Sequence, residues 1–202
     1  MLTTLASLKS ELGISGADND DDLTAVIRQQ SAAIESYCGR KFVQRVVTEV
    51  FRLSIGQPAL PLSVLPVVNI ISVTENGTLL DVDEYELDEP ANGGDGSGLL
   101  YRLDTEDERV DWAVGKTVIV YDAGYVLPGV TGYDLPYDVE RACLDLCVRT
   151  WSVKGRDPTL RSYENPDVER FAYTAADSVK TVGGLPEDVV GRLNRYRMLF
   201  AG

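Results

Sequence analysis

The sequence predicts an α+β fold, with a mainly helical core and an inserted, mostly antiparallel β-lobe. Apolar residues recur at helical spacing near both ends of the 202-residue chain and at every second position in the middle. Gly, Pro and Asn residues divide the middle into short segments. We therefore expect residues 1–42 and 135–202 to form the helical core, and residues 43–134 to form the β-lobe.

Two helices are expected before the β-lobe. Leu5, Leu8 and Leu12 share one helical face, with Thr4 as the N-cap and Gly13 as the stop. A longer helix over about 21–38 begins with acidic residues and is followed by basic ones, as the helix dipole favours. Its apolar stripe consists of Leu23, Val26, Ile27, Ile34 and Tyr37.

The β-lobe is expected to contain short strands joined by turns. Residues 43–51 have a period of two, which predicts a strand with one more solvent-exposed face. Residues 67–74 are expected to form a second strand. Asn76-Gly77 favours a type I′ hairpin turn leading into residues 78–82. Further short strands are expected at 85–87, 99–103 and 117–121.

Helical periodicity returns after the β-lobe. One helix is expected over about 136–152, with Pro136 in its first turn, where the missing N–H is harmless. A last helix is expected over about 186–199. Between them, Gly and Pro interrupt the pattern, and only residues 170–174 have the composition of a strand.

The composition excludes the commonest catalytic groups. The chain has no His, which removes Ser-His and Cys-His triads and His-metal clusters. Three cysteines without His cannot supply the four ligands of a zinc site. We expect Cys38, Cys143 and Cys147 to be buried, reduced thiols. No catalytic, cofactor-binding or metal-binding residue is predicted, although an enzyme that works through carboxylates remains an alternative.

Three acidic or glycine-rich stretches imitate functional motifs without completing them. Residues 18–22 begin like a calcium loop, but Leu23 and Gln29 stand where that loop needs Gly and Glu. Residues 93–98 are glycine-rich but lack the Lys-Ser/Thr pair of a phosphate loop. A glycosidase would use two carboxylates, and any acidic surface offers such pairs. Candidates of that kind are Asp81, Asp83, Glu84, Glu86 and Asp88.

The charge is acidic and unevenly distributed. The net charge is −13, and residues 51–135 contain 15 acidic and only 4 basic residues. Such a segment repels nucleic-acid phosphates, so sequence-specific DNA binding is not expected. No apolar run approaches the length of a membrane span, and nothing in the sequence indicates export.

The C-terminal residues have the composition of a protein interface. Arg, Tyr, Met and Phe are enriched in interfaces, and no acidic residue follows Asp188. An ordinary solvated helix face is the alternative. The residues with candidate docking roles are Arg192, Arg195, Tyr196, Arg197, Met198, Leu199 and Phe200.

Three stretches in order resemble the head–tail connector (adaptor) family of long-tailed bacteriophages. The first is 34–42, in which an aromatic, a small residue, Gly and Arg close a helix. The second is 118–125, a strand that runs into a Tyr-x-Ala-Gly-Tyr turn. The third is 135–139 with Ala142, similar to the Leu-Pro-x-Asp start of the next helix of the family. The segment from Arg156 onward is less similar to the family.

This resemblance implies a structural role without cofactors. Connector subunits form a homo-oligomeric ring, typically of twelve, in the neck of the virion after assembly in the host cytoplasm. One side of the ring binds the portal protein and the other receives a stopper or tail protein, with an axial channel for genomic DNA. The seven C-terminal residues named above are then the candidate portal-docking element. No membrane partner is implied.

Two other functions remain alternatives. The chain could be a head-completion (stopper) ring subunit, although that class usually lacks the leading pair of helices. It could also be an acidic inhibitor that mimics DNA and binds a host factor, because its middle segment is strongly acidic. The mass of the purified protein with and without portal separates these possibilities, since an inhibitor of this kind works as a small oligomer.

Overall fold

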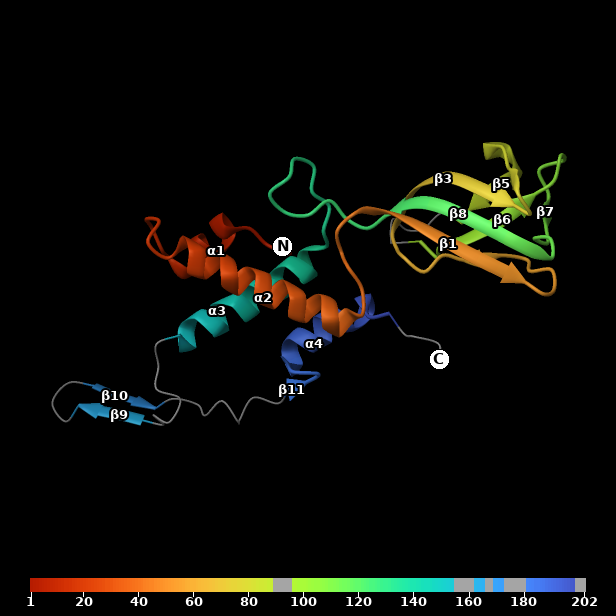
Figure 1. Cartoon of the computed structure of the whole chain (residues 1–202). Coiled ribbons are helices and arrows are strands. Elements are labelled where there is room, and N and C mark those ends of the chain that lie inside the picture. The colour runs from red at the N-terminus through yellow and green to blue at the C-terminus, as the bar shows by residue number, and fades with distance from the viewer. Residues whose placement is uncertain (89–95, 155–161, 166–168, 173–180, 199–202) are drawn as a thin grey trace. The chain divides into compact units, whose positions relative to one another are not determined.

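The computed structural model describes residues 1–88, 96–154, 162–165, 169–172 and 181–198. The chain forms two compact units, residues 42–126 and residues 1–41 with 127–202 (Figure 1). Helix accounts for 35% of the structure and strand for 30%, which confirms the α+β class. The expectation of a mainly helical fold is not confirmed, because three strands of the β-unit are each nine residues long.

The helical unit is built around one central helix. α1, α2 and α4 each contact α3. These helices are α1 (Leu5–Leu12), α2 (Asp20–Cys38), α3 (Tyr137–Val153) and α4 (Glu187–Leu193). The buried core side chains include Leu8, Leu23, Ile27, Ile34, Val139, Ala142, Leu146, Val189 and Leu193. The apolar stripes predicted for these helices therefore meet in one core.

The ends of α1 and α2 follow the predicted capping chemistry. The Thr4 hydroxyl accepts a hydrogen bond from the Ser7 N–H at 3.0 Å, which confirms the N-cap. Gly39 follows α2 with a φ of 66°. This left-handed conformation lets the Arg40 N–H donate to the Glu35 carbonyl at 3.1 Å. Pro136 is the N-cap of α3 and lies just before its first turn.

The last helix is shorter than predicted. α4 ends at Leu193 and a 3₁₀ turn, η3 (Asn194–Tyr196), follows it, whereas the sequence predicted helix to residue 199. The Met198 N–H donates to the Cys38 carbonyl at the end of α2, at 2.9 Å. A continuing α-helix would direct that N–H to the Asn194 carbonyl. A bond to another helix end therefore replaces the last helical turn.

Short hairpins precede α4. β9 (Ser162–Asn165) pairs with β10 (Glu169–Ala172), and β11 (Thr181–Val182) pairs with β12 (Leu185–Pro186). The strand predicted over 170–174 is present as β10, and residues 173–174 lie outside the described residues.

The β-unit consists of two antiparallel sheets. The larger sheet has the order β1-β8-β3-β4, and β8 is the strand that pairs with both β1 and β3 (Figure 1). Its strands are β1 (Arg45–Leu53), β8 (Gly115–Ala123), β3 (Val67–Glu75) and β4 (Thr78–Leu79). In the smaller sheet, β6 pairs with β2, β5 and β7. These strands are β2 (Leu60–Pro61), β5 (Tyr85–Leu87), β6 (Leu99–Leu103) and β7 (Arg109–Val110).

One hydrophobic core joins the two sheets. Trp112 is fully buried, and its indole N–H donates to the Leu100 carbonyl at 3.0 Å. A buried indole needs such an acceptor, because an unpaired N–H would be costly in an apolar core. The core consists of Leu60, Leu62, Val73, Leu80, Leu100, Trp112, Ile119, Tyr121 and Ala123.

The β3–β4 hairpin has the predicted turn. Asn76 and Gly77 both have positive φ values, 50° and 89°, as a type I′ turn requires. The strand expected over 78–82 is shorter, because residues 82–84 form the 3₁₀ helix η1 (Val82–Glu84). Asp81 and Glu84 form a capping box there, which stops the strand.

The β-unit begins and ends at one pair of residues. The Tyr125 N–H donates to the Phe42 carbonyl at 2.8 Å, and the two rings stack with centroids 6.3 Å apart. Gly124 precedes Tyr125 with a φ of 111°. A Cβ at this position would lie 2.7 Å from the Val43 carbonyl oxygen. Only glycine fits this approach, which explains the glycine of the Tyr-x-Ala-Gly-Tyr turn.

Gly124→Ala should destabilise the β-unit more than Gly77→Ala. Both positions have positive φ, but a Cβ at Gly77 has nothing within 4 Å. We expect Gly77→Ala to lower the free energy of unfolding by about 1–2 kcal/mol, and Gly124→Ala by about 2–5 kcal/mol. Urea unfolding followed by circular dichroism measures both, and equal losses would contradict the close-approach argument.

Candidate interaction surfaces

Two of the three predicted docking arginines have acidic partners in their own chain. The Arg192 guanidinium lies 2.6 Å from an Asp145 carboxylate oxygen, and Arg195 lies 3.5 Å from Asp138. Both carboxylates belong to α3 and are far from the arginines in sequence. Although no acidic residue follows Asp188 in the sequence, Arg192 and Arg195 therefore have partners on α3.

The other C-terminal residues differ in their exposure. Tyr196 is buried, and the Arg197 guanidinium lies 5.4 Å from the centroid of the Tyr37 ring. The side chain of Arg195 is 71% exposed, and Arg197 is also exposed. Met198 is half-buried, and Leu199 and Phe200 lie outside the described residues. Arg195 and Arg197 are thus exposed, and Arg192 is also at the surface, with a side chain that is 40% exposed, but it is paired with Asp145.

Asp145 joins α3 to its neighbours. It accepts from Arg192 and also lies 2.9 Å from Arg141, one helical turn away. Arg141 in turn lies 2.7 Å from Glu11 of α1. The hydrogen bond from Arg141 lowers the pKa of the Glu11 carboxyl below its usual value. Arg192 thereby serves first to hold α4 on α3, a role that sequence spacing alone does not reveal.

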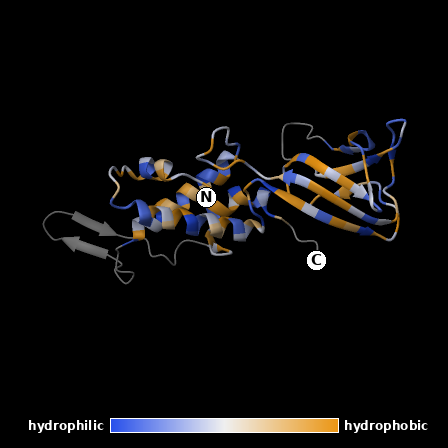
Figure 2. Cartoon of the chain, turned by 45° about the horizontal axis from the view of Figure 1, so that its top comes forward, coloured by the Kyte–Doolittle hydropathy of each residue, from blue (hydrophilic) through white to orange (hydrophobic). Residues whose placement is uncertain are grey.

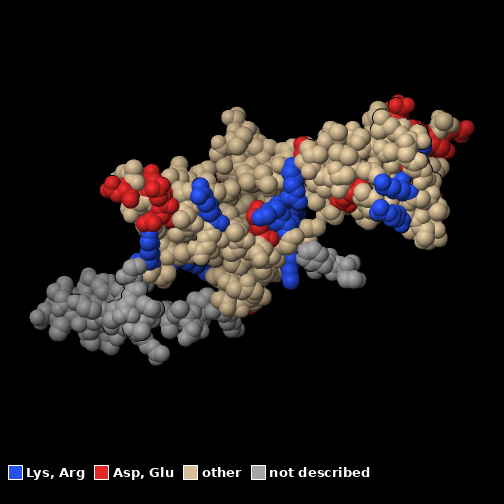
Figure 3. Space-filling view, viewed as in Figure 1, with Lys and Arg blue, Asp and Glu red and all other residues tan. Residues whose placement is uncertain are grey.

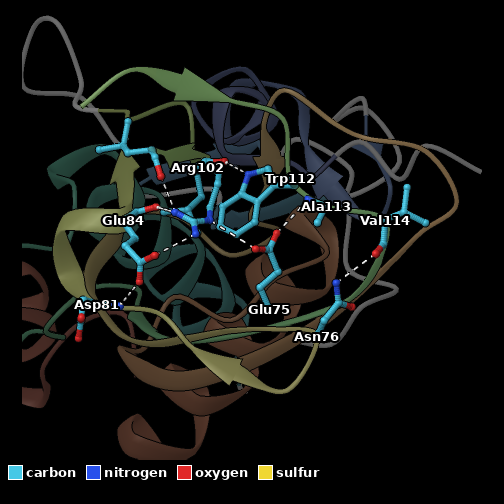
Figure 4. A network of polar contacts seen from close by, with 10 residues as sticks. Glu75, Asn76, Asp81, Glu84, Arg102, Trp112, Ala113 and Val114 are labelled. Carbon is cyan, nitrogen blue, oxygen red and sulfur yellow. Dashed lines mark hydrogen bonds and ion pairs between the residues drawn. The ribbon is translucent and has the colours of Figure 1, made fainter. Parts of the chain in front are cut away.

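A polar network surrounds Arg102 in the smaller sheet (Figure 4). Its guanidinium donates to the Glu84 carbonyl at 2.7 Å and to the Glu84 carboxylate at 3.0 Å. It also lies 3.4 Å from Glu75, whose other oxygen accepts from the Ala113 N–H at 2.9 Å. The Asp81 N–H and Arg102 lower the pKa of the Glu84 carboxyl. The network ties β3, η1 and β6 together.

An acidic groove lies beside this network. Arg102 is the single basic residue among the groove's described lining residues. Its acidic residues are Glu75, Asp81, Asp83, Glu84, Glu86, Asp104, Asp107 and Asp111. The space-filling view shows acidic side chains gathered at this end of the β-unit (Figure 3). Four of the five carboxylates considered as glycosidase candidates line this groove: Asp81, Asp83, Glu84 and Glu86.

Glu49 of β1 is held inside the β-unit by hydroxyl and amide donors. The hydroxyls of Tyr121 and Ser63 donate to its carboxylate, and the Ser63 N–H does so at 3.0 Å. Burial and the neighbouring Glu49 raise the pKa of the Tyr121 phenol, so it stays a donor. This cluster links β1, β8 and the segment after β2, and it lies on the inner side of the larger sheet.

The cysteines are buried and reduced, as predicted. Cys38, Cys143 and Cys147 are free thiols with no exposed side chain. Burial raises the pKa of Cys38 to about 11, so its thiol is not ionised near neutral pH. These residues pack in the helical core.

The described residues offer neither a metal cluster nor a membrane span. No group of three or more Cys, Asp or Glu side chains among them could hold a metal ion. The acidic run at 20–22 forms the first turn of α2, where Asp20 pairs with Lys9 at 2.6 Å. Across the described ranges, no helix is both long and apolar enough to cross a bilayer.

Comparisons with known proteins find similarity to a phage head-tail connector family and to neck chains of phage-like particles. Residues 2–75 match the family described as "phage gp6-like head-tail connector protein". A chain from the neck of an empty gene transfer agent particle, computed with C6 symmetry, superimposes with a TM-score of 0.54 at 16% identity. A chain from the neck of the native particle, computed with C12 symmetry, gives 0.52 at 15% identity. Each comparison covers 98% of this chain and 91% of the other. No curated protein matches the chain.

These findings confirm the predicted resemblance and support a structural role in a phage neck. The family match covers the helix pair and the strand region up to Glu75. The likeness to the neck chains extends over almost the whole fold.

Arg102→Met should destabilise the β-unit more than Arg109→Met. Arg102 and Glu75 have side chains only 16% and 14% exposed, whereas the Arg109–Glu86 pair is 47% exposed on both sides. Loss of Arg102 leaves the largely buried Glu75 carboxylate with the Ala113 N–H but without its cationic partner, so we expect a loss of about 1–3 kcal/mol. The Arg109 change removes a solvent-screened pair and should lower the free energy of unfolding by much less. Thermal unfolding of the two variants at pH 7 tests the difference, and equal melting temperatures would contradict it.

Proposed function

We propose that this chain, which resembles the phage gp6-like head–tail connector family over residues 2–75, is a structural ring subunit of a phage neck. The ring joins the portal vertex of the DNA-filled head to the next neck or tail protein. It leaves an axial channel for the genome. The match of residues 2–75 together with a likeness to neck chains over 98% of the sequence is the observation that carries this proposal.

Symmetry and charge support the ring and the channel. The similar neck chains come from particles analysed with C6 and C12 symmetry, which favours a ring of twelve for this chain. Residues 51–135 contain 15 acidic and 4 basic residues. DNA passing such a surface would meet repulsion instead of the phosphate contacts that produce tight, salt-dependent binding. A ring subunit of this kind lets DNA pass without sequence-specific recognition.

The C-terminal segment is the proposed portal-docking element. Arg195 and Arg197 present exposed guanidinium groups next to the end of α4, and guanidinium groups bind carboxylates with directional, multidentate contacts. Arg192 and Tyr196 are engaged within the helical unit, where they position this segment. Each exposed charge pair contributes only about 0.2–1 kcal/mol, but repetition around a ring multiplies a small gain.

The test is the binding of the purified chain to purified portal, measured as the mass of the complex. We expect the wild-type chain to add several copies to each portal. Arg195→Ala/Arg197→Ala, and separately removal of residues 199–202, should weaken binding by about tenfold or more, since one decade corresponds to 1.4 kcal/mol. These changes leave the buried residues of α4 in place, which a deletion from residue 190 would not.

The matched control is Arg149→Ala. Arg149 also forms an exposed pair, with Asp188 at 2.5 Å, but it belongs to α3 and not to the C-terminal segment. It should bind portal as the wild type does. Normal portal binding by both C-terminal variants would refute the docking role, whereas a wild-type chain that adds no copies to portal would refute the neck function itself.

A further inference from the structure

Strand β1 exposes apolar side chains on its outer side as well as burying others on its inner side. Val46 and Val50 are 61% and 44% exposed, while the alternate position Glu49 lies inward, bonded to Tyr121 and Ser63. A one-residue shift in register would exchange the two sides, and the core packing of Val47, Phe51 and Leu53 together with the Glu49 cluster fixes this choice. An antiparallel sheet that faces only water has polar residues on that side. The exposed valines therefore require a different explanation.

The outward apolar surface extends across three strands. Val118 and Val120 of β8 share this side with Val46 and Val50, because they alternate with the fully buried Thr117, Ile119 and Tyr121. β3 adds two residues at its register shifts, Val68 and Ile71, which are 53% and 49% exposed. Hydrophobic segments recur along these strands in Figure 2. Contiguous apolar surface of this kind marks an interaction site.

One end of this surface is basic. Arg52 of β1 lies directly opposite Lys116 of β8, and both side chains are exposed. Like charges in directly opposed positions destabilise a sheet. In the part of the chain that the structure describes, neither side chain forms an ion pair. A carboxylate from another molecule would relieve the repulsion between them. Figure 3 shows basic side chains on an otherwise largely uncharged surface over β1 and β8.

The acidic groove has the complementary composition. Asp83 and Asp111 line it, and within the described residues neither forms an ion pair. Exposed valines also line it, Val82 at 72% and Val110 at 38% exposed. The groove therefore combines unpaired carboxylates with exposed valine, as the outer side of the larger sheet combines unpaired cations with exposed valine.

We infer that the outer side of the β1-β8-β3 sheet binds the acidic groove of a neighbouring copy of this chain. In a cyclic ring each subunit must present two different, mutually complementary surfaces, because the contact is head-to-tail. The sheet surface and the groove are two such surfaces on one β-unit. Arg52 and Lys116 pair with Asp83 and Asp111 of the next copy, and Val50 packs near its Val82. This inference rests on the proposed ring and names the contact that closes it.

A charge exchange tests the contact. Arg52→Glu/Lys116→Glu makes the sheet surface acidic, and Asp83→Lys/Asp111→Lys makes the groove basic. Each double variant alone should lose at least tenfold in self-association, measured by native mass in the presence of portal. The quadruple variant carries both changes and should assemble again. An equimolar mixture of the two double variants should also assemble, since each supplies the surface that the other needs.

A cross-link provides a measurement that does not depend on charge. In a chain carrying both Val50→Cys and Val82→Cys, mild oxidation should produce a ladder of covalent oligomers, and each single variant should not. The native thiols Cys38, Cys143 and Cys147 are buried and do not compete. Circular dichroism confirms that each variant is folded, and Arg52→Gln/Lys116→Gln replaces the glutamate variant if it is not.

The outcomes separate this inference from the proposed function. A wild-type chain that forms a ring, with both double variants equally assembled and no covalent ladder, overturns the inference and leaves the neck function standing. A wild-type chain that forms no oligomer with portal overturns both. Loss of assembly in each double variant, with recovery in the quadruple variant and in the mixture, supports the inference.

Discussion

The β-unit depends on the junction at Gly124. Its N–H donates to the Pro66 carbonyl at 2.9 Å, and the next residue, Tyr125, bonds the Phe42 carbonyl at 2.8 Å. Three separate segments, those before β1, before β3 and after β8, therefore meet at one turn. The positive φ of Gly124 allows this meeting, because a side chain would collide with Val43. The central strand β8 reaches both of its partners from this fixed point.

The fixed register has consequences for the surface. Because β8 is anchored at Ala123, Tyr121 points inward to meet Glu49, and Val118 and Val120 must point outward. The same register places Lys116 opposite Arg52 at the far end of the strands. The same register therefore sets both the inward position of Glu49 and the outward positions of Val118 and Val120. Outward valines are expected on a sheet that contacts another molecule.

Much of the fold could be predicted from the sequence, because its signals are local. The Thr4 cap, the Gly13 and Gly39 stops and the Asn76-Gly77 turn each depend on a few adjacent residues, and all four are present. The early end of α4 could not be predicted, because the Met198 N–H bonds a carbonyl of α2 that lies 160 positions away in sequence.

The candidate surfaces were predictable only in part. Composition alone indicated an interface near Arg195 and Arg197, but the ion pair between Arg192 and Asp145 depends on how α4 packs on α3. The outward valines of β1 were visible as an alternating set, yet nothing in the sequence decided which side of the strand is buried. Contacts with distant segments decide it, namely the packing of Phe51 and Leu53 on the core and the hydrogen bonds from Tyr121 and Ser63 to Glu49.

A neck ring subunit is the central claim, and images of the chain bound to portal test it most directly. Class averages of the purified complex in the electron microscope should show a closed ring of this chain, with an open axial channel, on one side of the portal. Twelve copies are expected around the ring. Averages that show the portal alone, or single copies bound without closing a ring, would contradict the account.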